Sequence, residues 1–312
     1  MQEKRYRYLY GPVPSRRLGL SLGVDLVPMK TCSYNCIYCQ LGRTEETTVE
    51  RREYVPSDAV MAEIGSWIER DIPADYITMS GSGEPTLNST IGEIIQRIKE
   101  ITDIPVAVIT NGSLLSDGEV RDACAAADLV VPSLDAGSPS VFRHINRPDP
   151  RVTYEEMVSG LIDFSEMYAG ELWVEVFLVY PANTLERDLM DLKRVLDRIT
   201  YTRIHLNTCV RPPAESFADE APPEKIELAL DIFGEKAEGV LPFERETSKH
   251  ISDTVTETQI MNLLKRRPCS LQDMASSFQT SPNEVLKYLD PLVAGGKVAV
   301  QDKERQRFYT ID

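Results

Sequence analysis

Three cysteines lie within eight positions of one another in the segment "TCSYNCIYCQLG", residues 31–42. Cys32, Cys36 and Cys39 have the spacing C-x3-C-x2-C, and the Ser, Tyr and Asn residues between them do not form an apolar core pattern. Three clustered thiolates suit an iron–sulfur cluster in which one iron has no protein ligand. An open coordination position on a metal usually marks a catalytic site. The spacing therefore predicts a catalytic iron–sulfur centre on this segment.

Two other kinds of thiol chemistry fit the sequence less well. A structural zinc site needs a fourth ligand, and a thioredoxin-type redox pair needs only two cysteines. The three histidines are scattered singly along the chain. A second all-cysteine cluster is not expected either, because the remaining cysteines are isolated at Cys124, Cys209 and Cys269.

Composition and charge narrow the class of protein. The 42% hydrophobic and 27% charged residues are those of an ordinary globular protein. The net charge is −15, but residues 1–52 carry nine Lys/Arg against five Asp/Glu, and residues 252–312 carry eight of each. This acidic balance disfavours nonspecific nucleic-acid binding. The N-terminal "MQEKRYRYLYGP" has no signal-peptide pattern and no run reaches membrane-spanning length, so we expect a cytoplasmic protein without membrane contact.

The elements that would position the cysteines are strands and helices in alternation between residues 19 and 235. Six apolar runs with strand character alternate with segments of helical periodicity. This pattern predicts an α/β fold with a parallel sheet, either a partial (β/α)6 barrel or a doubly wound sheet, and in both the active site lies at the C-terminal ends of the strands. The six runs are "GLSLGVDLV", "YITMSG", "PVAVITNG", "LVVPSLD", "LWVEVFLVY" and "RIHLNTC".

Polar residues recur at inward-facing positions of these predicted strands. Side chains alternate between the two faces of a strand, and Glu175, His205, Asn207, Ser133 and Asp135 each alternate with apolar neighbours. One such residue would be explained by an internal hydrogen bond. Their recurrence on several strands favours a polar lumen that holds a ligand.

The pattern changes near the C-terminus. Residues 256–266 and 270–278 have short helical periodicities, and a third helix begins at "SPNE" with Ser281 as its cap. Two short strands, "GGKVAV" and "RFYTI", follow. Three helices and a two-stranded wing predict a winged-helix domain at residues 249–312, after a barrel domain at residues 1–248.

The motifs resemble those of the radical S-adenosylmethionine (SAM) superfamily. Its signature, C-x3-C-x-aromatic-C after the first strand, is matched by Cys32, Cys36, Tyr38 and Cys39. A glycine-rich motif ending in Glu-Pro after the second strand appears as "SGSGEP", residues 80–85, and "TNGSLL" and "SLDAG" follow the third and fourth strands. The stretches "GPVPSRRLG" and "NTCVRPPAE" resemble the subgroup that contains the tRNA wyosine-base synthases and uncharacterised relatives.

The resemblance spans most of residues 10–235 and implies a reaction. It implies a 4Fe-4S cluster, held by the three cysteines, whose fourth iron chelates SAM. An electron from the reduced cluster would cleave SAM to methionine and a 5′-deoxyadenosyl radical, which abstracts a substrate hydrogen. An electron donor such as ferredoxin or flavodoxin is implied as a partner.

The resemblance also implies residues that bind SAM. Gly81, Gly83 and Glu84 would receive the methionine amino group, because glycines allow close backbone approach and a carboxylate pairs with an ammonium. Tyr38 would lie beside the adenine. Polar residues at strand ends are candidates for the ribose and carboxylate of SAM: Asn111, Ser133, Asp135 and Glu175.

The substrate is much less determined by the sequence. Arg16 and Arg17 lie next to each other in "GPVPSRRLG" and would either clamp a substrate carboxylate or phosphate or pair with the acidic body of the protein. Arg211 in "VRPPAE" has the same two interpretations. His205 and Asn207, on the last predicted strand, would face the substrate space.

Three reactions or roles therefore stay open. A protein- or peptide-modifying enzyme would use the winged helix for docking. Wyosine-type tRNA modification would call for a second cluster and a more basic surface. An iron–sulfur transcriptional sensor would read DNA with the winged helix, yet its recognition segment "SPNEVLKYLDPLV" has one basic residue, Lys287, where several phosphate contacts are usual.

Overall fold

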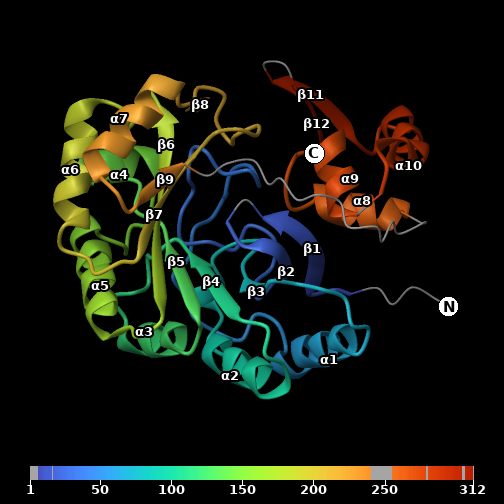
Figure 1. Ribbon diagram of the computed structural model, residues 1–312, viewed down its shortest axis with the longest axis horizontal. Coiled ribbons are helices and arrows are strands. Elements are labelled where there is room, and N and C mark those ends of the chain that lie inside the picture. Colours follow the sequence, from blue (N-terminus) through green and yellow to red (C-terminus); the bar gives the residue numbers. More distant parts are fainter. Residues whose placement is uncertain (1–5, 16, 240–254, 279, 304–305, 312) are drawn as a thin grey trace.

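The computed structural model of the chain describes residues 6–15, 17–239, 255–278, 280–303 and 306–311. It contains a large sheet flanked by helices and a smaller group of helices and strands near the C-terminus (Figure 1). We call these the barrel part, which ends at residue 239, and the C-terminal part, which begins at residue 255. The predicted domain boundary between residues 248 and 249 lies outside the described residues.

Among the described residues, the large sheet has nine strands in the order β1-β2-β3-β4-β5-β6-β7-β9, with β8 paired to β6. The strands from β2 to β7, and also β9, are parallel, whereas β1 and β8 pair antiparallel. The six predicted runs form β2 to β7, which confirms the mostly parallel α/β sheet. The strands are β1 (Leu9–Ser15), β2 (Gly19–Val24), β3 (Tyr76–Met79), β4 (Val106–Thr110), β5 (Leu129–Pro132), β6 (Glu171–Tyr180), β7 (Arg203–Thr208), β8 (Asp219–Glu220) and β9 (Ala237–Gly239).

The edge strand β1 was not expected from the sequence. Its sequence, "LYGPVPS", contains a glycine and two prolines, which weaken a strand assignment because proline cannot donate a ladder hydrogen bond. At the edge of a sheet one side of the strand needs no partner, and the pairing with β2 has an irregularity between Tyr10 and Val13. The position at the sheet edge therefore explains why this segment is tolerated as a strand.

Helices of the barrel part cover the outer side of the curved sheet in an arc from α1 to α7, as the partial barrel requires (Figure 1). Several begin at caps that the local sequence provides, such as the capping box of Thr153 and Glu156 at the start of α5. The helices are α1 (Ser57–Ile68), α2 (Ile91–Ile101), α3 (Gly118–Ala125), α4 (Pro139–Ile145), α5 (Tyr154–Met167), α6 (Glu186–Leu196) and α7 (Pro223–Phe233), with a 3-10 turn η1 (Pro85–Leu87).

The core lies between the sheet and these helices. Val174 and Val176 of β6 belong to the same buried cluster as Leu189 and Leu192 of α6, so the predicted outward-facing valines do pack on helices. Burying each such side chain contributes roughly 1.5–3 kcal/mol. This packing fixes the opposite face of the strands toward the interior of the barrel, where the predicted polar residues lie.

The C-terminal part has its own buried cluster and a three-stranded antiparallel sheet in the order β10-β12-β11. The three predicted helices are present, and Ser281 accepts a hydrogen bond from Glu284 N at the start of the third, as expected for its cap. Val13 of β1 packs against the cluster, which joins this part to the barrel. The elements are α8 (Glu257–Leu264), β10 (Cys269–Ser270), α9 (Leu271–Ser277), α10 (Pro282–Ala294), β11 (Ala299–Lys303) and β12 (Gln306–Thr310).

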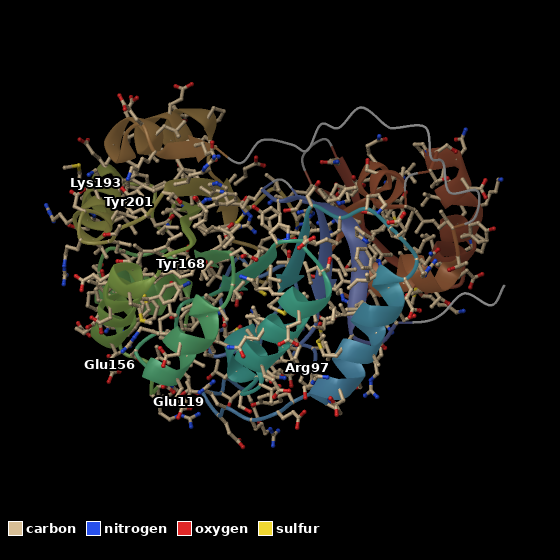
Figure 2. All side chains as sticks on the ribbon, turned by 60° about the horizontal axis from the view of Figure 1, so that its bottom comes forward. Arg97, Glu119, Glu156, Tyr168, Lys193 and Tyr201 are labelled. Atoms are coloured by element: carbon tan, nitrogen blue, oxygen red, sulfur yellow. The ribbon has the colours of Figure 1, made fainter. Side chains whose placement is uncertain are left out.

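The outer surface of the barrel helices is charged. Figure 2 shows Arg97 of α2, Glu119 of α3 and Glu156 of α5 on this side of the molecule. Arg97 forms ion pairs with Asp58 at 2.9 Å and with Glu93 at 3.1 Å. Across the described ranges, the structure contains no helix with the length and apolar character needed to cross a bilayer.

Candidate active site

A cavity of about 370 Å³ lies at the C-terminal ends of the parallel strands, where the sequence placed the active site. Cys32, Cys36 and Cys39, on the segment that follows β2, all line it and are half-buried. Residues from every parallel strand between β2 and β7 or from the segment after it reach the same space. The other predicted site residues that line the cavity are Arg17, Tyr38, Gly81, Gly83, Glu84, Asn111, Ser133, Glu175, Asn207 and Arg211.

The environment of the three thiols is consistent with their being ligands of a metal cluster. Burial raises the pKa of Cys32 to about 12, with a further rise from the Glu84 carboxylate, and raises the pKa of Cys36 well above its usual value. Such thiols ionise when a metal cation compensates the charge. Asn111 Nδ2 lies 3.5 Å from Cys32 Sγ, and Asn146 Nδ2 lies 3.6 Å from Cys36 Sγ. Hydrogen bonds to sulfur are among the features that tune an iron–sulfur cluster.

The other three cysteines are buried in separate hydrophobic clusters. Cys124 belongs to the main barrel core, Cys209 to a small cluster beside β6, and Cys269 to the core of the C-terminal part. In the part of the chain that the structure describes, no group of three or more His, Cys, Asp or Glu side chains is close enough together to hold a single metal ion. Cysteines that each bind a different iron of one cluster do not have to converge on one point.

The glycine-rich segment after β3, residues 80–85, lies directly against the cysteine segment. Glu84 N donates a hydrogen bond of 3.0 Å to Thr31 O. A Cβ atom on Gly83 would lie 2.0 Å from that same oxygen, and Gly81 has a φ of +127°. Both positions therefore require glycine, one because of the close backbone approach and the other because of its conformation.

Glu84 is a buried carboxylate that organises the ends of β3 and β4. Its Oε1 accepts hydrogen bonds from Thr86 N at 3.1 Å, from Thr86 Oγ1 at 2.6 Å and from Thr110 Oγ1 at 2.6 Å. Its Oε2 accepts a hydrogen bond of 2.7 Å from Asn111 N. Burial raises the pKa of Glu84, and these donors lower it again in part. Each carboxylate oxygen has two lone pairs, and among the described residues Oε2 accepts only the bond from Asn111 N, so Oε2 keeps capacity for one further donor.

Asp135 does not line the cavity and instead holds Tyr38 in place. Its carboxylate accepts hydrogen bonds from Tyr38 Oη at 2.5 Å, from Asn146 Nδ2 at 2.8 Å and from Phe177 N at 3.0 Å. The Tyr38 ring stacks on Phe177 with 4.0 Å between the ring centroids. Burial raises the pKa of Asp135 to about 6. The expectation that Asp135 contacts SAM is therefore corrected, because Asp135 lies outside the cavity lining and its carboxylate binds Tyr38 and Asn146 instead.

Glu175 lies at the centre of a second polar group. It forms a buried ion pair with Arg17 and accepts a hydrogen bond of 3.0 Å from Asn207 Nδ2. A backbone bridge joins Ser133 to Glu175 across β5 and β6. Arg17 thus pairs with an acidic residue of the barrel, which was one of its two interpretations. Arg16 lies outside the described residues.

His205 does not line the cavity either. It is buried two residues before Asn207 on β7, and so lies farther from the C-terminal end of the strand. Its Nε2 is 2.9 Å from Glu238 Oε1, and its ring centroid is 5.0 Å from that of Trp173. Burial, followed by the nearby Arg17, lowers the pKa of His205. The expectation that His205 faces the substrate space is corrected, because inward direction alone does not place a residue at the mouth.

The C-terminal part supplies cavity residues that the sequence reasoning missed. Leu263 of α8 and Arg266 and Arg267, which follow it, line the cavity together with Arg211 after β7. Arg211 Nη2 lies 3.6 Å from Asp273 Oδ1 of α9. The basic run "KRR" in a domain without net charge was the available signal, but nothing in the sequence tied it to the barrel.

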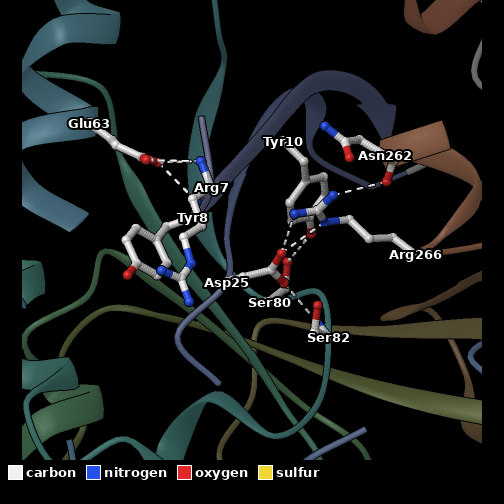
Figure 3. Close-up of polar contacts among 9 residues, drawn as sticks. All are labelled: Arg7, Tyr8, Tyr10, Asp25, Glu63, Ser80, Ser82, Asn262 and Arg266. Atoms are coloured by element: carbon white, nitrogen blue, oxygen red, sulfur yellow. Dashed lines mark hydrogen bonds and ion pairs between the residues drawn. The ribbon is translucent and has the colours of Figure 1, made fainter. Parts of the chain in front are cut away.

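Figure 3 shows how this part is attached to the site. The Arg266 guanidinium donates to Asp25 Oδ2 from Nε at 2.8 Å and from Nη2 at 2.5 Å, and lies over the Tyr10 ring, 4.6 Å from its centroid. Asp25 Oδ1 accepts a hydrogen bond of 2.8 Å from Ser82 N in the glycine-rich segment. Tyr10 Oη and Ser80 Oγ are 3.0 Å apart. One ion pair therefore links the C-terminal part to the segment that carries Glu84.

Sequence comparison identifies the class of protein to which this fold and site belong. A sequence profile of the radical SAM superfamily matches residues 26–193, which is more than half of the chain. The chain therefore belongs to the radical SAM superfamily and is an enzyme of this class. Enzymes of the superfamily use a 4Fe-4S cluster and SAM as cofactors.

Within this class the chain is a member of the UPF0026 family. It is 33% identical over 307 residues to a UPF0026 protein of Methanocaldococcus jannaschii, covering 96% of this chain and 94% of that protein. It is 31% identical to a UPF0026 protein of Helicobacter pylori (strain J99), covering 99% of both chains. It is also 40% identical over 292 residues to a Brachyspira hyodysenteriae protein named GTPase Obg, of which it spans 43% of the length.

Solved structures share the fold at low sequence identity. A structure of TYW1 with a lysine-pyruvate adduct bound has a TM-score of 0.52 and 16% identity, covering 68% of this chain and 72% of that chain. A radical SAM methyltransferase from Sphaerobacter thermophilus has a TM-score of 0.51 and 19% identity, covering 70% of this chain and 66% of that chain. This likeness supports the partial-barrel architecture.

Proposed function

We propose that Cys32, Cys36 and Cys39 hold a 4Fe-4S cluster and that the chain uses it to abstract hydrogen from a substrate after reductive cleavage of SAM. The observation that carries the proposal is that these three thiols share one cavity with the glycine-rich segment at the C-terminal ends of the strands. When bound, the cluster supplies the electron that cleaves SAM to methionine and a 5′-deoxyadenosyl radical. A ferredoxin or flavodoxin would deliver that electron.

The residues around the cysteines would bind and orient SAM. Glu84 Oε2 would accept the methionine ammonium, because it has acceptor capacity left and lies on the segment that touches the cysteine segment. Tyr38, held by Asp135, offers an aromatic surface for the adenine. Polar groups of the strand ends would bind the ribose and carboxylate: Asn111, Ser133 and Glu175.

The C-terminal part would be a winged helix that closes the mouth of the cavity. Its order of three helices and an antiparallel sheet supports this assignment, and Leu263, Arg266 and Arg267 extend into the cavity lining. DNA binding by α10 has less support. Lys287 is the one basic residue of the recognition segment, and its ammonium group pairs with the Glu284 carboxylate. A substrate of protein or peptide type remains our proposal, with the C-terminal part as the docking module.

Wyosine-type tRNA modification is the second candidate. It gains support from the fold shared with TYW1. The separate burial of Cys124, Cys209 and Cys269 supports a single cluster and so favours the first candidate.

Anaerobic reconstitution with iron and sulfide tests the proposal. Four irons per chain are expected, with loss of the cluster in Cys36→Ala and retention in the matched control Cys124→Ala. Added SAM should change the electron paramagnetic resonance spectrum of the reduced cluster, because SAM would bind to the open iron. An unchanged spectrum would contradict SAM binding at the cluster, and about eight irons per chain would favour the wyosine-type candidate.

A further inference from the structure

Two half-buried arginines from different parts of the chain line the same cavity. Arg211 follows β7, and Arg267 follows α8, yet both line the same space. Burial lowers the pKa of Arg211, and the neighbouring positive charge of Arg267 lowers it further. Two guanidinium groups that repel each other in a desolvated site are costly unless an anion lies between or beside them.

The other cavity arginines have close carboxylate partners, whereas, among the described residues, Arg211 and Arg267 lack acceptors for some of their guanidinium N–H groups. Arg17 pairs with Glu175, and Arg266 pairs with Asp25. Arg211 has one carboxylate oxygen at 3.6 Å, and no ion pair of Arg267 occurs within the described ranges. The Nε atoms of both arginines are buried and have no hydrogen-bond acceptor among the described residues.

The charge of the cavity wall differs from that of the whole protein. The chain has a net charge of −15. Among the described residues, however, the acidic side chains in the wall are Glu84 and Glu175, and both already accept hydrogen bonds or ion pairs from the protein. The basic side chains in the wall are Arg17, Lys30, Arg211, Arg266 and Arg267. An acidic protein that gathers cations around one cavity concentrates positive potential there, which attracts anions.

We infer that Arg211 and Arg267 together form a subsite for one anionic group of the substrate, a carboxylate or a phosphate. The planar guanidinium groups present paired donors that match either group. The inference rests on the proposed function, because it assigns the anion to the molecule that reacts at the cluster. Since Arg267 belongs to the C-terminal part, the subsite is complete only when that part is docked on the barrel.

Calorimetric titration of the cluster-loaded protein tests the inference. Inorganic phosphate and acetate are titrated separately, under anaerobic conditions and at constant ionic strength, with SAM present. Arg267→Gln and Arg211→Gln should each weaken binding of the preferred anion by about tenfold to hundredfold, because each removes charge-assisted hydrogen bonds. Arg307→Gln, in the exposed pair with Asp302 at 3.1 Å, is the matched control and should bind as the unaltered protein does.

Each outcome of the titration either supports or overturns the proposed anion subsite. Preferential binding of phosphate or of acetate would support the subsite and name the anionic group, and partial recovery in Arg267→Lys would show that charge rather than packing is responsible. No anion binding, or equal binding in Arg267→Gln and the unaltered protein, would overturn it. A SAM affinity that falls in parallel would also overturn it, because the arginines would then belong to the cofactor site. If the unaltered protein assembles no cluster, the proposed function fails, while Arg267-dependent phosphate binding would still support the subsite.

Discussion

Replacement of Arg266 tests the attachment of the C-terminal part to the barrel. Arg266 donates two hydrogen bonds to Asp25, and the two side chains are only 12% and 9% exposed. Arg266→Met removes the guanidinium that lies over the Tyr10 ring, retains much of the apolar stem, and leaves the Asp25 carboxylate buried without its cation. Breaking a buried ion pair from one side typically costs about 3–5 kcal/mol, because the remaining charge is uncompensated.

The double variant separates the ion pair from other effects of each substitution. Asp25→Asn combined with Arg266→Met removes both charges, so no buried charge is left without a partner. We expect its loss of unfolding free energy to be smaller than the sum of the two single losses by about 2 kcal/mol or more. The exposed pair of Arg307 and Asp302 is the control, and its coupling energy should not exceed about 1 kcal/mol.

Urea unfolding of the apoprotein measures these energies. Both tryptophans, Trp67 and Trp173, lie in the barrel part, so their fluorescence reports the barrel, whereas circular dichroism reports both parts. If the ion pair couples the two parts, Arg266→Met should also separate the fluorescence and dichroism transitions. A coupling energy no larger than that of the exposed control would refute the argument that this pair is desolvated and structurally important.

Two further predictions concern the barrel. Burial raises the pKa of Asp135 from its ordinary value of 3.8 to about 6. Its contribution to the free energy of unfolding, about 3 kcal/mol, is therefore fully present below pH 3.8 and is lost as the pH rises through 6. Urea midpoints measured from pH 4 to 7 should depend less on pH in Asp135→Asn than in the unaltered protein. Glu84→Gln puts an amide donor where a carboxylate oxygen accepts a hydrogen bond from Thr86, Thr110 or Asn111. The substitution should lower the unfolding free energy by about 1–3 kcal/mol and weaken SAM binding measured by equilibrium dialysis. A destabilised variant with unchanged SAM affinity would limit Glu84 to a structural role.

Features that depend on local spacing could be predicted from the sequence. The three cysteines lie on one segment, so their proximity follows from C-x3-C-x2-C alone. The six apolar runs predicted the positions of strands β2 to β7. Side chains alternate between the two faces of a strand, and those on the helix side must be apolar because they are buried. The same alternation predicted that Ser133, Glu175 and Asn207 face inward, and all three line the cavity.

The depth of a residue in the barrel, and its contacts with residues far away in the sequence, required the folded structure. Alternation gives the face of a strand but not the distance from its C-terminal end, which is why His205 was expected at the mouth and lies below it. Asp135 and Tyr38 are 97 positions apart, and Arg266 and Asp25 are 241 apart. Such pairs form because strands from the whole chain end at one edge of the sheet and the C-terminal part packs on β1, and no local pattern encodes that packing.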